Sequence, residues 1–365
     1  MKFVLSLILM MGMGLSQAWA LNVDEEGILE LAKDHTVYYR YTKPVADKPT
    51  VVLLNGLIYS ISHWDQYYQE MTQKGYGVLQ VAYSTQPESL RGLEGEAPYF
   101  SRFIMTLQGP SMQGLETKDL ASDILKTADF LGIKKFHLLT LSYGSIVGSH
   151  IANHHADRVL SVILVAPAVI SSNRYIPYGA SRHAHYLLQH KVNVNPFYDP
   201  DYFYDAEIYQ SMRLIMQPQI ATLDLEGVGF ENFFNGVYQM ARSAKYFDLK
   251  DQADKAWPKT TLVMASIEDA PLQKDQLQFW KLKQQAAKNS QLIFVDGAPH
   301  AIPGAYPKVM SMITDAILES QVTKPESTFS IDSAQWWEGC VNSKGQACEQ
   351  FVGSSSGSSS ASSSK

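Results

Sequence analysis

Cysteine is nearly missing from this sequence. The chain has 2 Cys, Cys340 and Cys348, and they do not form a C-x-x-C pair. Zinc fingers, iron–sulfur clusters and cysteine nucleophiles in the body of the protein are therefore excluded. A basic excess is missing as well, since the formal net charge is −6, which argues against a nucleic-acid partner. No internal repeat occurs. What remains, 45% hydrophobic and 18% charged residues, is typical of a globular protein.

The first 20 residues have the pattern of a secretory signal peptide. A short basic start at Lys2 precedes an apolar run, and small residues flank Trp19 where a signal peptidase reads the chain. We expect residues 1–20 to be removed and the mature chain to be exported to the periplasm or the medium, without a membrane-spanning segment. An uncleaved N-terminal anchor is the alternative. In an oxidising compartment we expect Cys340 and Cys348 to form a disulfide.

Short apolar runs alternate with amphipathic stretches along most of the chain. The pattern predicts strands and helices in alternation, which is typical of an α/β protein with a mostly parallel, doubly wound sheet and helices on both faces. The expected strands are residues 27–33, 36–41, 51–54, 78–83, 136–141, 159–165, 260–265 and 292–295. The expected helices are residues 62–74, 117–131, 145–153, 272–288 and 307–318.

Other segments interrupt or extend this pattern. Residues 168–256 are rich in Phe and Tyr and favour short helices, so we expect a mainly helical cap inserted into one core. That core comprises residues 21–167 and 257–323, which lie on either side of the cap. Residues 324–352 form a C-terminal extension that carries both Cys, and residues 353–365 form a Ser-rich tail that we expect to be flexible. The irregular stretch 84–115 is expected either to wall a pocket or to make transient contact with a membrane surface.

A serine lies at the sharpest turn of the pattern. Ser142 stands in Thr140-Leu141-Ser142-Tyr143-Gly144, between an expected strand and an expected helix. Such a turn pushes the hydroxyl out of the sheet and sets it at a helix N-terminus, where the free N–H groups favour negative charge. A Ser two residues before a Gly is common in proteins, so the pattern by itself is weak. Its position between a strand and a helix makes Ser142 a candidate nucleophile.

A serine nucleophile needs a base, and the base needs an acid that orients it. His300 follows the expected strand at 292–295, and Asp269 follows the one at 260–265, with Glu268 as its rival. We favour Asp269 because it immediately precedes an Ala-Pro turn. The order Ser142, Asp269, His300 places all three at the carboxyl ends of strands, where α/β sheets hold their sites.

Two backbone N–H groups would form the oxyanion hole. Tyr143 follows the candidate nucleophile, and Leu57 lies just beyond the strand at 51–54, after a glycine that lets the backbone approach a substrate. The histidine pairs 154–155 and 183/185 lack a carboxylate spacing such as H-E-x-x-H, so they are read as solvated surface. We expect no metal and no cofactor.

These motifs together resemble the α/β-hydrolase superfamily over about residues 26–167 and 257–320. The resemblance rests on the Asn-Gly-Leu string at 55–57, the Ser142 turn, Ser266 to Asp269 and Pro299-His300. It implies a Ser142–His300–Asp269 triad, an oxyanion hole at Leu57 and Tyr143, and a cap at 168–256. Asn55 stands where the family usually has His, Thr140 where it usually has Gly, and Ser145 in place of the usual second Gly.

The leading hypothesis is an exported serine hydrolase that cleaves a carboxylic ester, including a thioester or a lipid ester, through an acyl-enzyme. The departures at Asn55 and Thr140 motivate a second hypothesis, a catalytically silent binding protein on the same fold. Peptidase, carbon–carbon-bond hydrolase and cofactor-free peroxidase chemistry also remain open, since one fold hosts all of them. A surface-attachment protein that works through its C-terminal extension is a further alternative. The sequence leaves the oligomeric state undetermined.

Overall fold

The computed structural model describes most of the chain between residues 21 and 323. Gaps fall at residues 94–95, 97, 103–114, 169–221, 246–248, 253, 256, 266–269 and 287–290, and residues 338–341 and 344–346 follow separately. The predicted signal peptide, the Ser-rich tail, most of the insertion and Cys348 therefore lie outside the described residues. The predicted disulfide stays a prediction.

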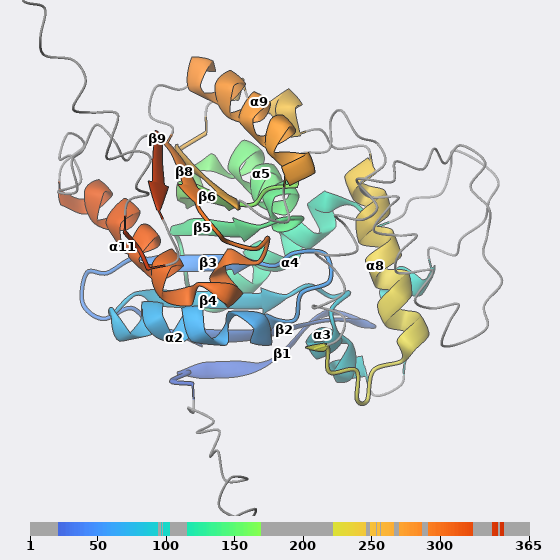
Figure 1. Ribbon diagram of the computed structural model, residues 1–365. Helices are drawn as coiled ribbons and strands as arrows, with labels where there is room; N and C mark the ends of the chain where they lie inside the picture. The colour runs from blue at the N-terminus through green and yellow to red at the C-terminus, as the bar shows by residue number, and fades with distance from the viewer. Residues whose placement is uncertain are drawn as a thin grey trace, which may run out of the picture.

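Nine strands form one sheet in the order β1-β2-β4-β3-β5-β6-β7-β8-β9 (Figure 1). Strand β2 pairs antiparallel with β1 and with β4, and all other neighbouring strands of the sheet pair in parallel. The predicted α/β class with a mostly parallel sheet is confirmed. The strands are β1 (Glu25–Ala32), β2 (His35–Thr42), β3 (Thr50–Leu54), β4 (Gly77–Ala82), β5 (Phe136–Leu141), β6 (Val159–Val165), β7 (Lys259–Ala265), β8 (Gln291–Val295) and β9 (Glu338–Val341).

Helices cover both faces of the sheet, as the alternation predicts (Figure 1). One face packs against α2, α10 and α11, and the other against α4, α5 and α9. The α-helices are α2 (Asp65–Gln73), α3 (Pro87–Leu90), α4 (Thr117–Phe130), α5 (Gly144–His154), α8 (Phe230–Lys245), α9 (Ala270–Ala286), α10 (Ile302–Ala305) and α11 (Pro307–Thr323). The 3-10 helices are η1 (Ile61–Trp64), η2 (Arg91–Leu93), η3 (Tyr99–Arg102), η4 (Ala156–Arg158) and η5 (Leu249–Gln252).

Helices cover β3 on both faces of the sheet, which explains the unbroken apolar run from Val51 to Leu54. All five of its residues are buried. Val51 and Leu53 join the core under α2 and α11, whereas Val52 and Leu54 join the core under α4 and α5. Side chains of a strand alternate between the two faces of its sheet, so a strand covered on both sides has apolar side chains on both.

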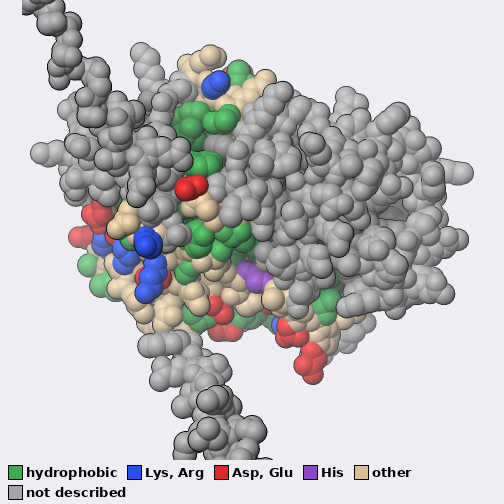
Figure 2. Space-filling model, viewed as in Figure 1, with side chains coloured by type: hydrophobic (Ala, Val, Ile, Leu, Met, Phe, Trp, Pro, Cys, Tyr) green, Lys and Arg blue, Asp and Glu red, His purple; other side chains and the backbone are tan. Residues whose placement is uncertain are grey.

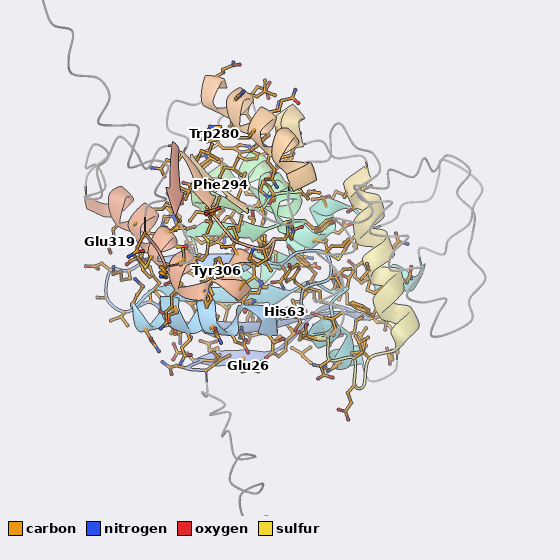
Figure 3. The ribbon with its side chains drawn as sticks, viewed as in Figure 1. Glu26, His63, Trp280, Phe294, Tyr306 and Glu319 are labelled. Atoms are coloured by element: carbon orange, nitrogen blue, oxygen red, sulfur yellow. The ribbon has the colours of Figure 1, made fainter. Side chains whose placement is uncertain are left out.

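Ionic contacts attach α11 to the loop between α2 and β4 and to the loop before β3. Lys74 Nζ lies 2.7 Å from Asp315 Oδ2, and the Tyr76 hydroxyl donates to Asp315 Oδ1 at 2.7 Å. Lys48 pairs with Glu319. Figure 2 shows Lys and Arg side chains beside Asp and Glu on this side of the molecule, where Figure 3 labels Glu319. These partly exposed pairs orient α11, while its buried apolar residues supply most of its stabilisation.

Two segments of the fold differ from the pattern expected of them. The described part of the insertion contains α8, a helix of 16 residues, rather than only short pieces. The C-terminal extension contributes β9, which pairs in parallel with β8 and so enlarges the sheet. None of the helices in the described part of the chain is both long and apolar enough to cross a membrane.

His137 on β5 supplies a test of this core. Its Nδ1 lies 2.7 Å from Ser161 Oγ, and burial lowers its pKa to about 4. Below the ordinary pKa of His, about 6.5, the unfolded chain takes up a proton that the folded protein refuses until about pH 4. The free energy of unfolding should therefore fall by up to about 1.4 kcal/mol per pH unit as the pH drops through this window.

Replacing His137 with Gln should flatten this pH dependence, measured by urea unfolding at pH 7, 6 and 5. Replacing the exposed Lys135 with Gln is the control and should leave the slope as in the wild type. Equal slopes for all three proteins would show that His137 is not buried in its neutral form.

Candidate active site

The turn between β5 and α5 holds Ser142 in a strained backbone conformation. Its φ is 53°, in the left-handed region that residues with a β-carbon seldom adopt. The Ser142 N–H donates to Val165 O at 3.0 Å, and its carbonyl accepts from the N–H of Ser145 at 2.9 Å and of Ala168 at 3.2 Å. The residue is half-buried between fully buried neighbours. These backbone bonds hold the strained turn in place, as the sequence context predicts.

Gly144 allows α5 to start against the end of β3. A β-carbon at this position would lie 2.4 Å from Leu54 O and 2.8 Å from Asn55 O. No side chain fits there without moving the backbone. The glycine is therefore required for close approach, and that approach fixes the direction in which the helix leaves the Ser142 turn.

Thr140 occupies a position where the family pattern has Gly, and the structure accommodates it. A β-carbon at Gly148, one helical turn after Gly144 in α5, would lie 2.6 Å from the Thr140 methyl. The methyl thus fills the space that Gly148 leaves. The Thr140 hydroxyl bonds to Ser145 Oγ at 3.1 Å and donates to Ile163 O at 3.3 Å. Thr140 and Ser145 form a buried polar pair, so neither departure from the pattern crowds the turn.

The loop after β3 lies next to this turn. The hydroxyl of Tyr83 donates to Asn55 O at 3.2 Å, and its ring meets the ring of Tyr143 edge to face, with centroids 6.4 Å apart. Burial raises the pKa of both tyrosines, so both phenols stay neutral. The N–H groups of Leu57 and Tyr143 form no hydrogen bond with another described residue. Donors of this kind suit an oxyanion hole.

His300 follows β8 at the same edge of the sheet. It is 2% exposed, and its carbonyl accepts from the Ile302 N–H at 3.0 Å. The hydroxyl of Tyr306, labelled in Figure 3, donates to Gly297 O at 2.7 Å and closes the loop that carries His300. Since β5 and β8 are both parallel strands, Ser142 and His300 lie at the same carboxyl edge, with β6 and β7 between their strands.

The comparisons with known proteins agree with this topology. No protein-family model and no curated protein sequence matches the chain. An α/β hydrolase enzyme from a Medee basin deep-sea metagenome library has a similar structure, with 15% identity, a TM-score of 0.55, and coverage of 84% of this chain and 100% of that chain. An esterase from Exiguobacterium antarcticum gives 14% identity, a TM-score of 0.55, and coverage of 81% and 100%. The enol-lactonase from Burkholderia xenovorans LB400 gives 16% identity, a TM-score of 0.51, and coverage of 80% of this chain and 100% of that chain.

The chain has the α/β-hydrolase fold. The resemblance drawn from the sequence motifs is confirmed at the level of the fold. Identities of this size carry no activity across, so the chemistry must be argued from the residues of this chain.

The structure describes four of the five predicted site residues. Ser142, His300, Leu57 and Tyr143 lie in the loops at the carboxyl edge of the sheet. Asp269 and its rival Glu268 come just after β7 and lie outside the described residues, so the choice between them stays a prediction. Within the described ranges, no group of three or more His, Cys, Asp or Glu is placed to hold a metal ion.

Helix α8 of the insertion contacts the Ser142 turn through Tyr143 and the turn after β4 through Thr85. The Ser243 hydroxyl and the Tyr143 hydroxyl are 2.6 Å apart, and Thr85 bonds to Met240 Sδ at 2.8 Å. A β-carbon at Gly236 would lie 2.8 Å from Thr85 Cβ, so the helix packs closely on the turn after β4. Sequence analysis missed these contacts, although residues 233, 237, 240 and 244 form an apolar stripe with helical spacing.

The fit between Thr140 and Gly148 can be tested by stability. Replacing Gly148 with Ala should lower the free energy of unfolding by about 1–3 kcal/mol, because the new methyl meets a β-branched side chain that cannot move aside. In a Thr140→Ser background, which keeps the hydroxyl and removes the methyl, the same change should be neutral or stabilising, since Ala favours a helix over Gly by about 1 kcal/mol.

Urea unfolding of the four proteins in this double-mutant cycle gives the interaction energy, expected to be about 1 kcal/mol or more. Additive effects would mean that the Thr140 methyl does not rest on Gly148.

Proposed function

We propose that the protein is a serine hydrolase that cleaves a carboxylic ester, with Ser142 as nucleophile, His300 as base and Asp269 as the acid that orients it. The observation that carries the proposal is the strained φ of Ser142 at a strand–helix junction sealed by Gly144. Backbone strain persists only where the surroundings enforce it, and such residues concentrate at functional sites. The buried His300 at the same sheet edge supports the proposal.

In the proposed reaction, His300 takes the proton of the Ser142 hydroxyl as the oxygen attacks the ester carbonyl carbon. The N–H groups of Leu57 and Tyr143 stabilise the negative carbonyl oxygen of the tetrahedral intermediate. The C–O bond to the alcohol then breaks, and protonated His300 gives its proton to the leaving alcohol. Water attacks the acyl-enzyme with His300 again as base, which releases the acid and restores Ser142. No metal or cofactor takes part in these steps.

Apolar side chains of α8 point to the class of substrate. Helix α8 places Met240 and Ala244 in the same buried apolar cluster as Tyr143, which suits an apolar acyl or alcohol group, including a lipid. We propose that the chain is exported after loss of residues 1–20, on the strength of its N-terminal pattern. A panel of fluorogenic esters with acyl groups of increasing length would define the acyl length that the protein prefers.

The nucleophile is tested by covalent labelling. A fluorophosphonate probe should label the purified protein, and replacing Ser142 with Ala should abolish the label, because the probe reacts only with an activated serine. Ser149, also buried in α5 with its hydroxyl bonded to Ser145 O at 2.6 Å, is the matched control, and its replacement with Ala should leave labelling intact. An unlabelled wild type would favour the silent binding protein, and persistent labelling without Ser142 would point to another serine.

The acid is tested by paired amide substitutions. Replacing Asp269 with Asn should lower kcat for ester hydrolysis by about 10⁴-fold, since the amide would favour the wrong tautomer of His300. Replacing Glu268 with Gln should change kcat by a few-fold at most. The opposite ranking would assign the acid to Glu268.

A further inference from the structure

The side chain of Gln86 connects the turn after β4 with the loop after β3. It is 1% exposed and precedes Pro87 at the start of α3. Its Oε1 accepts from the Tyr83 N–H at 2.8 Å and from Asn55 Nδ2 at 2.9 Å. Its Nε2 donates to Tyr59 O and, at 3.5 Å, to Gly56 O. One primary amide thus uses both of its N–H groups and accepts two hydrogen bonds.

The orientation of this amide is fixed by the backbone. A backbone N–H can only donate and a carbonyl can only accept, so Tyr83, Tyr59 and Gly56 together leave Gln86 a single arrangement. That arrangement also decides the orientation of Asn55, whose Nδ2 must face Gln86 Oε1. Asn55 Oδ1 is buried and has no hydrogen-bond partner among the described residues, so the bond to Gln86 is the one that sets the amide of Asn55.

These bonds hold the backbone on both sides of Leu57. Gly56 O lies immediately before it and Tyr59 O two residues after it, and both accept from the same nitrogen of Gln86. A catalytic N–H must already point at the place where charge develops, because a loop that has to reorganise loses much of that stabilisation. We infer that Gln86 is a positioning residue, which sets the Leu57 N–H of the oxyanion hole without touching the substrate. The inference rests on the proposed serine hydrolase function.

The first test replaces Gln86 with Ala and measures fluorophosphonate labelling rate together with kcat and KM for p-nitrophenyl butyrate. Labelling and kcat should fall by about 10²-fold, the usual cost of misplacing a reacting group by about 1 Å, with KM changing little. Gln291 is the matched control: it is 3% exposed, accepts from Thr261 Oγ1 at 2.9 Å, and lies at the amino end of β8, away from the site. Replacing Gln291 with Ala should reduce stability but leave both rates as in the wild type.

The second test replaces Gln86 with Glu, which keeps the shape of the side chain. A protonated carboxyl can still donate to Tyr59 O, whereas a carboxylate would face two carbonyl oxygens and push the loop away. The ratio of the variant's labelling rate to the wild-type rate should therefore fall as the pH rises from 5 to 8. A purely structural role would leave this ratio constant, and this variant decides the matter if Gln86→Ala does not fold.

The outcomes separate the inference from the proposed function. Labelling of folded Gln86→Ala within about threefold of the wild type, or a ratio for Gln86→Glu that does not change with pH, would overturn the role of Gln86 alone. Absence of labelling in the wild type and in the Gln291 variant would overturn the serine hydrolase proposal, and the role of Gln86 with it.

Discussion

The close approach of Gly144 to the carbonyl oxygens of Leu54 and Asn55 is the constraint on which the site depends. Backbone meets backbone there, so neither partner can relax by changing a rotamer. With α5 held against β3, the chain must reverse direction within a few residues of the end of β5, and Ser142 absorbs the reversal through its positive φ. The same contact brings the loop after β3 beside the Ser142 turn. One packing contact therefore positions both the proposed nucleophile and the Leu57 N–H of the proposed oxyanion hole.

The parts of the fold that the sequence predicts are those controlled by local pattern. The apolar run of β3 and the stripe on α4 gave the correct elements because burial on two faces, or on one helical stripe, leaves a direct mark on residue order. Helix boundaries shifted by a few residues; the helix expected at 62–74 begins as η1 and continues as α2 from Asp65. For the site, the positions of Ser142 and His300 follow from strand ends alone, so they could be predicted without any knowledge of contacts.

The features that could not be predicted depend on partners distant in sequence or on pairing across the sheet. Thr140 departs from the family pattern, and its complement, Gly148, lies on the far side of the Ser142 turn. Gln86 sits among polar residues before a proline, and no spacing rule connects it with the loop at 55–59. Strand β9 has four residues and no alternation of polar and apolar side chains, so only its pairing with β8 reveals it.

The ninth strand has a consequence for the order of assembly. Parallel pairing with β9 satisfies backbone groups along one edge of β8 that an eight-stranded sheet would leave open. Because β9 ends at Val341, a ribosome must synthesise most of the chain before that edge is covered. Until then the nascent sheet presents a template for pairing with other polypeptides, and a premature stop codon upstream of residue 338 leaves that template exposed in the finished product.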